Sequence, residues 1–205
     1  MDADRPRDDT GGTPEEARGR WLSRRGFGLG LGGAVLTLSG CLAPEPEGDA
    51  DGAGPQARIA ALERAIAGLS PAVDPEEAAR AAQIAISYPL ELRRRYGVTD
   101  PPLIHNTKVN MGLRPRGLCW HWAEDLERRL AAEGFATLDL HRAIANATSI
   151  LIDHSTVVIS ARGATMEEGI VLDGWRHGGT LFWSRVPEDP RYRWERRAEV
   201  FARRR

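Results

Sequence analysis

The chain has 205 residues, and its 28 Lys and Arg side chains nearly balance its 29 Asp and Glu side chains, for a formal net charge of −1. A protein that holds nucleic acid on a broad basic surface needs an excess of positive charge, so we expect no nucleic-acid partner. The length corresponds to one domain that can bury a sizeable core.

The first 40 residues have the features of an export signal. Residues 1–20 are charged and show no apolar periodicity, and Ser-Arg-Arg-Gly-Phe at 23–27 is followed by a short apolar run that ends Leu-Ser-Gly-Cys at 38–41. A basic flank, a short apolar core and small residues before a cut site are typical of a signal peptide, and this run is too short to span a membrane. The alternative is a disordered tail with a chance apolar patch.

Two motifs in this signal resemble those of exported bacterial lipoproteins. The paired arginines are similar to a twin-arginine signal. The Leu-Ser-Gly-Cys ending is similar to a lipobox, in which the cysteine becomes the lipidated first residue. We therefore predict a signal peptide over residues 1–40 and a membrane anchor at lipidated Cys41, with the protein facing the periplasm or the cell exterior. The acidic segment 41–55 predicts a flexible linker, and residues 56–205 predict the folded domain.

Helices are predicted in the first part of the domain. Apolar residues at helical spacing indicate a helix over 56–69, and the start signal Asp-Pro-Glu-Glu indicates a second helix over about 76–87. Pro89 and the later Asp-Pro-Pro sequence interrupt any longer helix. Residues 103–115 then predict an ordered loop.

The next element is a helix with a cysteine in its first turn. Gly-Leu-Cys-Trp-His-Trp at 117–122 predicts a short turn and then a helix that stops near Gly134. Unpaired backbone N–H groups at a helix N-terminus stabilise a thiolate, so Cys119 is a candidate nucleophile. A small core residue is the alternative. One face of the helix has the spacing of a buried stripe, made of Cys119, Trp122, Ala123, Leu126 and Leu130.

Cysteine usage supports a reactive role for this residue. The sequence contains two cysteines, Cys41 and Cys119. If Cys41 carries lipid, Cys119 has no internal disulfide partner in an oxidising compartment. An unpaired thiol is a liability there, so its presence indicates a function.

After Gly134 the pattern changes to strands. Helices followed by consecutive strands predict an α+β domain in which the N-terminal helices and the cysteine helix pack on an antiparallel sheet. The tail from Pro187 predicts a polar, solvated end with Trp194 and Phe201 as apolar anchors. The strand-like runs are 136–144, 149–161, 168–175 and 179–186.

Two strand residues complete a candidate catalytic set with the cysteine. If a hairpin is centred between Gly163 and Ala164, His154 lies directly opposite Asp173, with Cβ atoms about 5 Å apart. A slip of two residues leaves a diagonal contact, whereas a slip of one breaks it. Cys119 would then be the nucleophile, His154 the general base and later the general acid, and Asp173 the group that orients the imidazole.

The order of these residues resembles that of the transglutaminase-like superfamily, a branch of the papain-like cysteine enzymes. The matching residues are Gly-Leu-Cys at 117–119, Trp-Ala at 122–123, His154 before an apolar strand, and Leu-Asp at 172–173. The resemblance covers about 113–176. It implies a papain-like fold and a cysteine protease, amidase or acyl-transfer activity, without identifying a substrate.

Four further residues are candidates for contacts with substrate. Asn106 and Asn110 lie in the predicted loop before the cysteine helix, where they are either amide donors for an oxyanion or solvated polar groups. Trp120 and Trp175 are candidates for the walls of a cleft, with core packing as the alternative.

A second histidine and a metal site are the remaining possibilities near the thiol. His121 follows Cys119 by two residues, or about 200° around a helix, so it faces away and is expected to pair with Glu124 or Asp125. A metal site made of Cys119, His121 and His141 would lack a recognisable ligand spacing, so we expect no metal and no cofactor.

The leading hypothesis is an envelope-anchored cysteine hydrolase or acyltransferase that acts on amide bonds. Location alone points to a peptide or peptidoglycan-like substrate. One alternative is a non-catalytic binding or scaffold lipoprotein with the same fold. Another is a peptidoglycan hydrolase similar to the NlpC/P60 family, which also orders Cys before His. That family tends to place its third polar residue sooner after the histidine than the 19 residues that separate His154 from Asp173.

Overall fold

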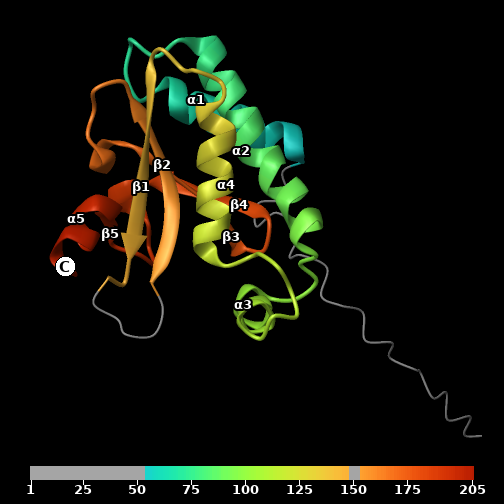
Figure 1. Ribbon diagram of the computed structural model, residues 1–205. Helices are drawn as coiled ribbons and strands as arrows, with labels where there is room; N and C mark the ends of the chain where they lie inside the picture. Colours follow the sequence, from blue (N-terminus) through green and yellow to red (C-terminus); the bar gives the residue numbers. More distant parts are fainter. Residues whose placement is uncertain (1–53, 148–152) are drawn as a thin grey trace, which may run out of the picture. The chain divides into compact units, whose positions relative to one another are not determined.

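The structure is a computed structural model that describes residues 54–147 and 153–205. The predicted signal peptide, Cys41 and the linker up to residue 53 lie outside the described residues, as do residues 148–152 of the second strand-like run. Within the described part, five α-helices and a five-stranded antiparallel sheet form an α+β unit (Figure 1). The predicted α+β class with an antiparallel sheet is therefore confirmed.

The first two helices begin where the sequence predicts, but the second is much longer. They are α1 (Pro55–Ala67) and α2 (Pro75–Tyr96). Asp74 caps α2, because its Oδ1 accepts two backbone N–H bonds of 2.8 and 3.0 Å in the first turn. Gly97 ends the helix in the left-handed conformation, with φ at +64°.

The prediction that Pro89 ends this helix is wrong. Pro89 lies inside α2, where its ring cannot donate to the carbonyl four residues earlier. The ring is buried against the sheet at Gly174, where an added Cβ would lie 3.1 Å from Pro89 Cβ. Packing of a proline on a glycine thus compensates for the missing hydrogen bond.

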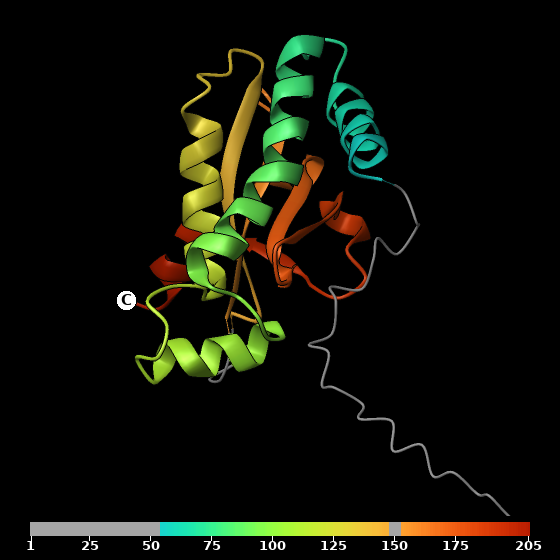
Figure 2. The same cartoon turned by 90° about the vertical axis from the view of Figure 1, so that its right-hand side faces the viewer.

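The predicted loop before the cysteine helix is also wrong, because it contains helix α3 (Pro102–Asn110). Proline is unfavourable inside a helix but suits its first turn, where an N–H has no partner to lose. Figure 2 shows α3 lying crosswise beneath the lower ends of α2 and the next helix, α4 (Cys119–Ala131). The predicted buried stripe of α4 is confirmed.

The sheet has the order β4-β3-β2-β1-β5, and every neighbouring pair is antiparallel. The first four strands form a meander, and the last returns to the free edge of β1. Helix α4 packs over β2 and β3, while α2 lies beside it toward β4. The strands are β1 (Leu138–Ala145), β2 (His154–Ala161), β3 (Ile170–His177), β4 (Thr180–Arg185) and β5 (Trp194–Arg196).

The register of the β2–β3 hairpin differs by two residues from the predicted one. Val157 pairs with Leu172, whereas a hairpin centred between Gly163 and Ala164 would pair it with Ile170. The connection holds a short 3-10 helix, η1 (Met166–Glu168), instead of a tight turn. His154 and Asp173 are therefore diagonal neighbours on one face of the sheet and not directly opposite.

The sheet is buried on both faces. The helix side forms the main core, and a smaller core on the other side is closed by the two 3-10 helices and the C-terminal segment. Residues of the main core include Leu62, Ile84, Leu126, Val157 and Leu172. Residues of the smaller core include Ala143, Val158, Met166, Val171 and Trp194.

The C-terminal segment is not the solvated end that we expected. After the 3-10 helix η2 (Val186–Glu188), strand β5 pairs Trp194 with Ala145, and helix α5 (Arg197–Arg203) packs on β1 and β5. The predicted anchor Trp194 is buried, but Phe201 remains 36% exposed. The segment joins the sheet because its apolar residues complete the smaller core.

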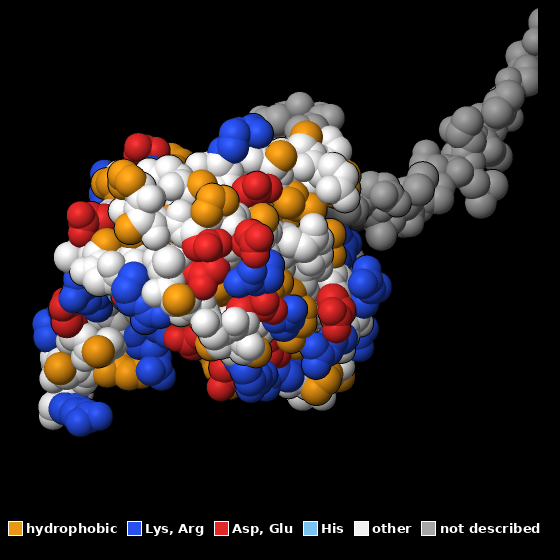
Figure 3. All heavy atoms as spheres, turned by 90° about the horizontal axis from the view of Figure 1, so that it is seen from above, with side chains coloured by type: hydrophobic (Ala, Val, Ile, Leu, Met, Phe, Trp, Pro, Cys, Tyr) orange, Lys and Arg blue, Asp and Glu red, His pale blue; other side chains and the backbone are white. Residues whose placement is uncertain are grey.

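The outer surface is mixed in charge. In the view from above in Figure 3, basic and acidic side chains alternate over short distances with apolar ones between them. Ion pairs at the surface include Arg95–Glu91 and Arg162–Asp139. Among the described helices, none combines the length and apolar content needed to cross a membrane.

Candidate active site

The turn that delivers Cys119 to the start of α4 is supported from below by α3. Gly117 has φ at +128°, and a Cβ there would lie 2.3 Å from Nε2 of His105, so only glycine fits. His105 is buried, and its Nε2 donates to the backbone oxygen of Arg116 at 2.9 Å. The thiol position is thus fixed by a histidine packed under the turn.

His121 closes the same turn from the helix side. Its Nδ1 accepts hydrogen bonds from the backbone N–H groups of Gly117 and Leu118, both at 3.1 Å. Burial, and then the charge of Arg116, lower the pKa of His121, which keeps the ring neutral and Nδ1 free to accept. His121 is therefore a structural group of the turn.

The expected pairing of His121 with a carboxylate is wrong. Glu124 and Asp125 instead accept from Arg116, at 3.1 Å each. Tyr96 also donates to Asp125, which ties the first turns of α4 to the end of α2. These contacts hold the helix that carries the thiol without using the thiol itself.

The structure brings His154 and Asp173 into direct contact. His154 Nε2 donates to Asp173 Oδ2 at 2.6 Å, and both side chains are 1% exposed. The other oxygen of Asp173 accepts from the backbone N–H groups of Trp175 and Arg176, at 3.0 and 3.1 Å. Burial alone would raise the pKa of Asp173, but the charge and hydrogen bond of His154 lower it, and Arg176 adds to that effect.

Two residues that the sequence did not reveal extend this pair. Arg176 Nε donates to Asp173 Oδ2 at 3.0 Å, and its two terminal nitrogens contact Asp189 at 3.1 and 2.7 Å. Asp189 also accepts from the indole N–H of Trp194 at 2.9 Å. The result is a buried chain of alternating charge from His154 to Asp189. No local signal separates these two residues from the other charges of the chain's polar C-terminal part.

The thiol lies beside this pair at the start of β2. Cys119 Sγ donates to the backbone oxygen of Asp153, the residue before His154, at 3.4 Å. Nδ1 of His154 is buried without a hydrogen-bond partner among the described residues, so it is the nitrogen open to the thiol. Burial lowers the pKa of His154, but the charge and hydrogen bond of Asp173, together with the nearby Cys119, raise it to about 9.

Aromatic rings enclose the imidazole. The ring centre of His154 lies 4.8 Å from that of Trp175, 4.6 Å from Tyr192 and 5.3 Å from Trp194. The indole N–H of Trp175 donates to Asn106 Oδ1 at 3.1 Å, so α3 also supports this side of the site. The rings limit the access of water and fix the orientation of the imidazole.

The four residues predicted to contact substrate lie in different surroundings. Asn106 holds Trp175, and Asn110 is exposed on α3. Trp120 is 46% exposed and lines a cavity beside the thiol, while Trp175 is buried against His154. Trp120 is therefore the only one of these four that faces this cavity, within the part of the chain that the structure describes.

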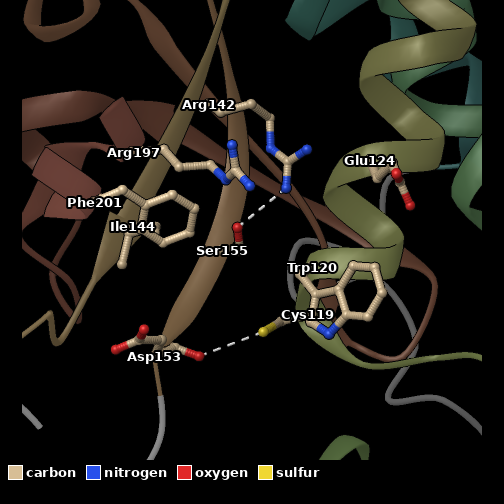
Figure 4. Close-up of a pocket in the computed structure, with 9 residues that line it drawn as sticks. All are labelled: Cys119, Trp120, Glu124, Arg142, Ile144, Asp153, Ser155, Arg197 and Phe201. Carbon is tan, nitrogen blue, oxygen red and sulfur yellow. Dashed lines mark hydrogen bonds between the residues drawn. The ribbon is translucent and has the colours of Figure 1, made fainter. Parts of the chain in front are cut away.

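The cavity beside the thiol has a volume of about 320 Å³ (Figure 4). Pockets of this size hold one or two amino-acid residues, at the low end of small-molecule sites. Its walls come from the start of α4, from strands β1 and β2, and from α5. The lining residues are Cys119, Trp120 and Glu124, then Arg142, Ile144, Asp153 and Ser155, and finally Arg197 and Phe201.

Within residues 54–147 and 153–205, no group of three or more His, Cys, Asp or Glu side chains is arranged to hold a metal ion. Comparison with protein-family models, curated proteins and solved structures found no match. At one end of the sheet, a thiol, a buried imidazole and a buried carboxylate meet.

Proposed function

We propose that the protein is a cysteine hydrolase or acyltransferase that acts on amide bonds through Cys119, His154 and Asp173. The observation that carries the proposal is the buried His154–Asp173 hydrogen bond, which uses Nε2 and leaves Nδ1 without a partner among the described residues. That nitrogen belongs to the residue directly after Asp153, whose backbone oxygen accepts from the thiol. A nucleophile, a base and a group that orients the base are the parts that this chemistry needs.

The charges of the site favour an ion pair as the reactive state. Because the pKa of His154 is raised to about 9, its neutral ring, in which Nε2 carries the proton and Nδ1 does not, readily takes up a second proton at neutral pH. Transfer of the thiol proton from Cys119 to Nδ1 then gives a thiolate next to an imidazolium, and the carboxylate of Asp173 stabilises the imidazolium through Nε2.

The thiolate attacks the carbonyl carbon of the amide and forms a C–S bond. As the C–N bond breaks, His154 gives its proton to the leaving amine, and the acyl group remains on Cys119 as a thioester. Water or a second amine then adds to the thioester while its proton passes to His154. The C–S bond breaks, and the thiolate–imidazolium pair is restored. Water as acceptor gives hydrolysis, and an amine gives transfer.

The topology supports a papain-like, transglutaminase-like relationship as part of the proposal. A helix with Cys in its first turn packs on an antiparallel sheet. Strands β2 and β3 then supply His and Asp, in that order. Peptide or peptidoglycan-like amides are the proposed substrates, because the resemblance of residues 1–40 to a lipoprotein signal supports a location at the cell envelope.

Alkylation of Cys119 tests the catalytic proposal. The rate with iodoacetamide is measured by mass spectrometry from pH 6 to 9 in the wild type and in His154→Ala. We expect rapid alkylation of the wild type near neutral pH, and of His154→Ala only as the pH approaches about 8.5, the reference value of a free cysteine. His141→Ala is the matched control, because its ring bonds to Ser160 and not to the site. A wild-type profile like that of a free cysteine would favour a non-catalytic scaffold.

The proposed anchor has a separate test. In full-length protein expressed in a bacterial host, Cys41→Ser removes the acceptor for lipid. We expect the variant to leave the membrane fraction after a salt wash, while the wild type stays bound. Retention of Cys41→Ser on membranes would reject the lipoprotein proposal without affecting the catalytic one.

A further inference from the structure

Two arginines line the end of the cavity that is remote from the sulfur of Cys119. Arg142 comes from β1 and Arg197 from the start of α5, and Figure 4 shows both guanidinium groups pointing into the cavity above Ser155. The thiol lies at the other end, beside the backbone of Asp153. One bound molecule can therefore meet two cations and the thiol at once.

The two carboxylates of the cavity are already neutralised by other arginines. Asp153 accepts from Arg204 at 2.5 and 2.8 Å. Glu124 accepts from Arg116 at 3.1 Å. Of the two guanidinium groups above Ser155, that of Arg142 is paired with Glu127, and neither Asp153 nor Glu124 pairs with that of Arg197.

The guanidinium groups of Arg142 and Arg197 can each take a further anionic partner. Arg142 forms an ion pair with Glu127 and a hydrogen bond with Ser155, each at 3.2 Å, but its Nε is buried without a hydrogen-bond partner among the described residues. Arg197 stacks on the ring of Phe201 at 4.3 Å and forms no ion pair within the described part of the chain. A buried donor without a partner costs free energy, and so does a second cation, Arg197, held beside the already paired Arg142.

A carboxylate would relieve both costs. It offers two anionic oxygens that match the donors of a guanidinium and form stronger hydrogen bonds than neutral acceptors do. Part of the cavity wall is apolar, since Trp120, Ile144 and Phe201 line it. Such a wall suits the aliphatic part of an amino-acid residue.

We propose that this cavity binds a carboxylate of the substrate, so that the amide attacked by Cys119 belongs to a peptide with a free carboxylate on the residue next to that bond. The carboxylate is either a chain terminus or an acidic side chain. This inference rests on the proposed function, because it assigns the substrate class of the same thiol.

Two matched pairs of alkylating probes test the site in the full-length protein. N-iodoacetylglycine and N-iodoacetylglycinamide differ only in a terminal carboxylate, and the α-amides of N-iodoacetylglutamic acid and N-iodoacetylglutamine differ only in a side-chain carboxylate. The rate of Cys119 modification is measured by mass spectrometry below saturation. We expect one acid to react about tenfold faster than its amide, a factor within the range of one charge-assisted hydrogen bond. The pair that shows the preference identifies the source of the carboxylate.

Arginine variants connect the preference to the cavity. Arg197→Gln and Arg142→Gln should each bring the acid-to-amide ratio down toward one, and the ratio within each variant is the readout. Arg197 is exposed, so its variant does not threaten the fold. Arg203→Gln is the matched control, because it removes the same charge from the same helix at a residue that pairs with Glu195. It should keep the wild-type ratio.

The outcomes separate the two proposals. A wild-type ratio of one or less with both probe pairs would overturn the carboxylate site, and so would a preference that survives in both Arg197→Gln and Arg142→Gln. In either case, rapid alkylation by the amides near neutral pH would leave the proposed function standing. Slow alkylation by every probe, with the pH profile of a free cysteine, would instead reject the proposed function.

Discussion

The thiol side and the imidazole side of the candidate site are built in different ways. The thiol side uses one short stretch of chain, from His105 in α3 to Trp122 in α4. The contacts that fix its turn are hydrogen bonds made by His105, His121 and Trp122, and the ion pairs of Arg116 lie further along α4. The imidazole side combines β2, β3 and the C-terminal segment. Its contacts are between charged groups, from His154 through Asp173 and Arg176 to Asp189.

This difference determines how each side responds to substitution. A neutral hydrogen bond contributes about 1 kcal/mol net, and a neutral group of similar shape can replace either partner. A buried charge that loses its partner costs roughly 3–5 kcal/mol, because no solvent compensates it. The imidazole side should therefore be sensitive to single changes of charge, and the thiol side tolerant of changes that keep its shape.

The largest effect is expected for Asp173→Asn. The amide cannot stabilise an imidazolium, and burial then lowers the pKa of His154 below its value in the wild type. Thiol alkylation at neutral pH should become slow, and amide turnover should fall by up to ~10⁴-fold, as in a well-studied serine triad. Since Arg176 also loses one of its two charged partners, the free energy of unfolding should fall by roughly 3–5 kcal/mol.

Three measurements check this prediction: NMR titration of His154, alkylation of Cys119 and urea unfolding. Asp139→Asn is a matched control, because that aspartate forms a surface pair with Arg162 outside the site. An unchanged His154 pKa in folded Asp173→Asn would remove Asp173 from the mechanism. It would also end the contrast between a charged side and a neutral side.

Much of the thiol side was predictable because its signals are local. The spacing of the α4 stripe and the Gly-Leu-Cys turn are both readable in one window of sequence. The supporting helix α3 was missed because its prolines were interpreted as breakers, whereas they begin the helix. Likewise, α2 continues through Pro89 because of Gly174, which is remote in sequence and adjacent only in space.

The imidazole side was predictable only in part. The contact between His154 and Asp173 follows from the alternation of strand side chains, so it survives the two-residue error in register. The error arose because the η1 turn cannot be recognised as a register signal from residues alone. Arg176 and Asp189 were not predicted, because two isolated charges carry no sign that they pair inside the fold.

An effect of intermediate size is expected on the free energy of unfolding as the pH rises through the pKa of His154. The pKa of His154 rises from 6.5 to about 9 in the folded protein. A raised histidine pKa stabilises the fold while the ring is protonated, so the contribution is complete below about pH 6.5 and is lost as the pH rises to 9. The size is roughly 3 kcal/mol. Urea unfolding at several pH values should show this loss in the wild type, but not in His154→Gln; parallel curves for the two proteins would contradict the prediction.

The smallest effect is expected on the thiol side, at His121. Its Nδ1 accepts two backbone N–H bonds at the turn before Cys119, so His121→Ala leaves two donors without a partner. The unfolding free energy should fall by about 1–3 kcal/mol, with a modest loss of thiol alkylation because the turn loosens.

His121→Asn is the informative variant, since an amide oxygen can take the place of Nδ1 as a neutral acceptor. It should restore most of the stability and reactivity that His121→Ala loses. Asn at position 154 should restore nothing, because that site needs a group that can carry a proton and a charge. If His121→Asn were as slow in alkylation as His154→Asn, the charge of His121 would have to take part, and the thiol side could no longer be regarded as a neutral support.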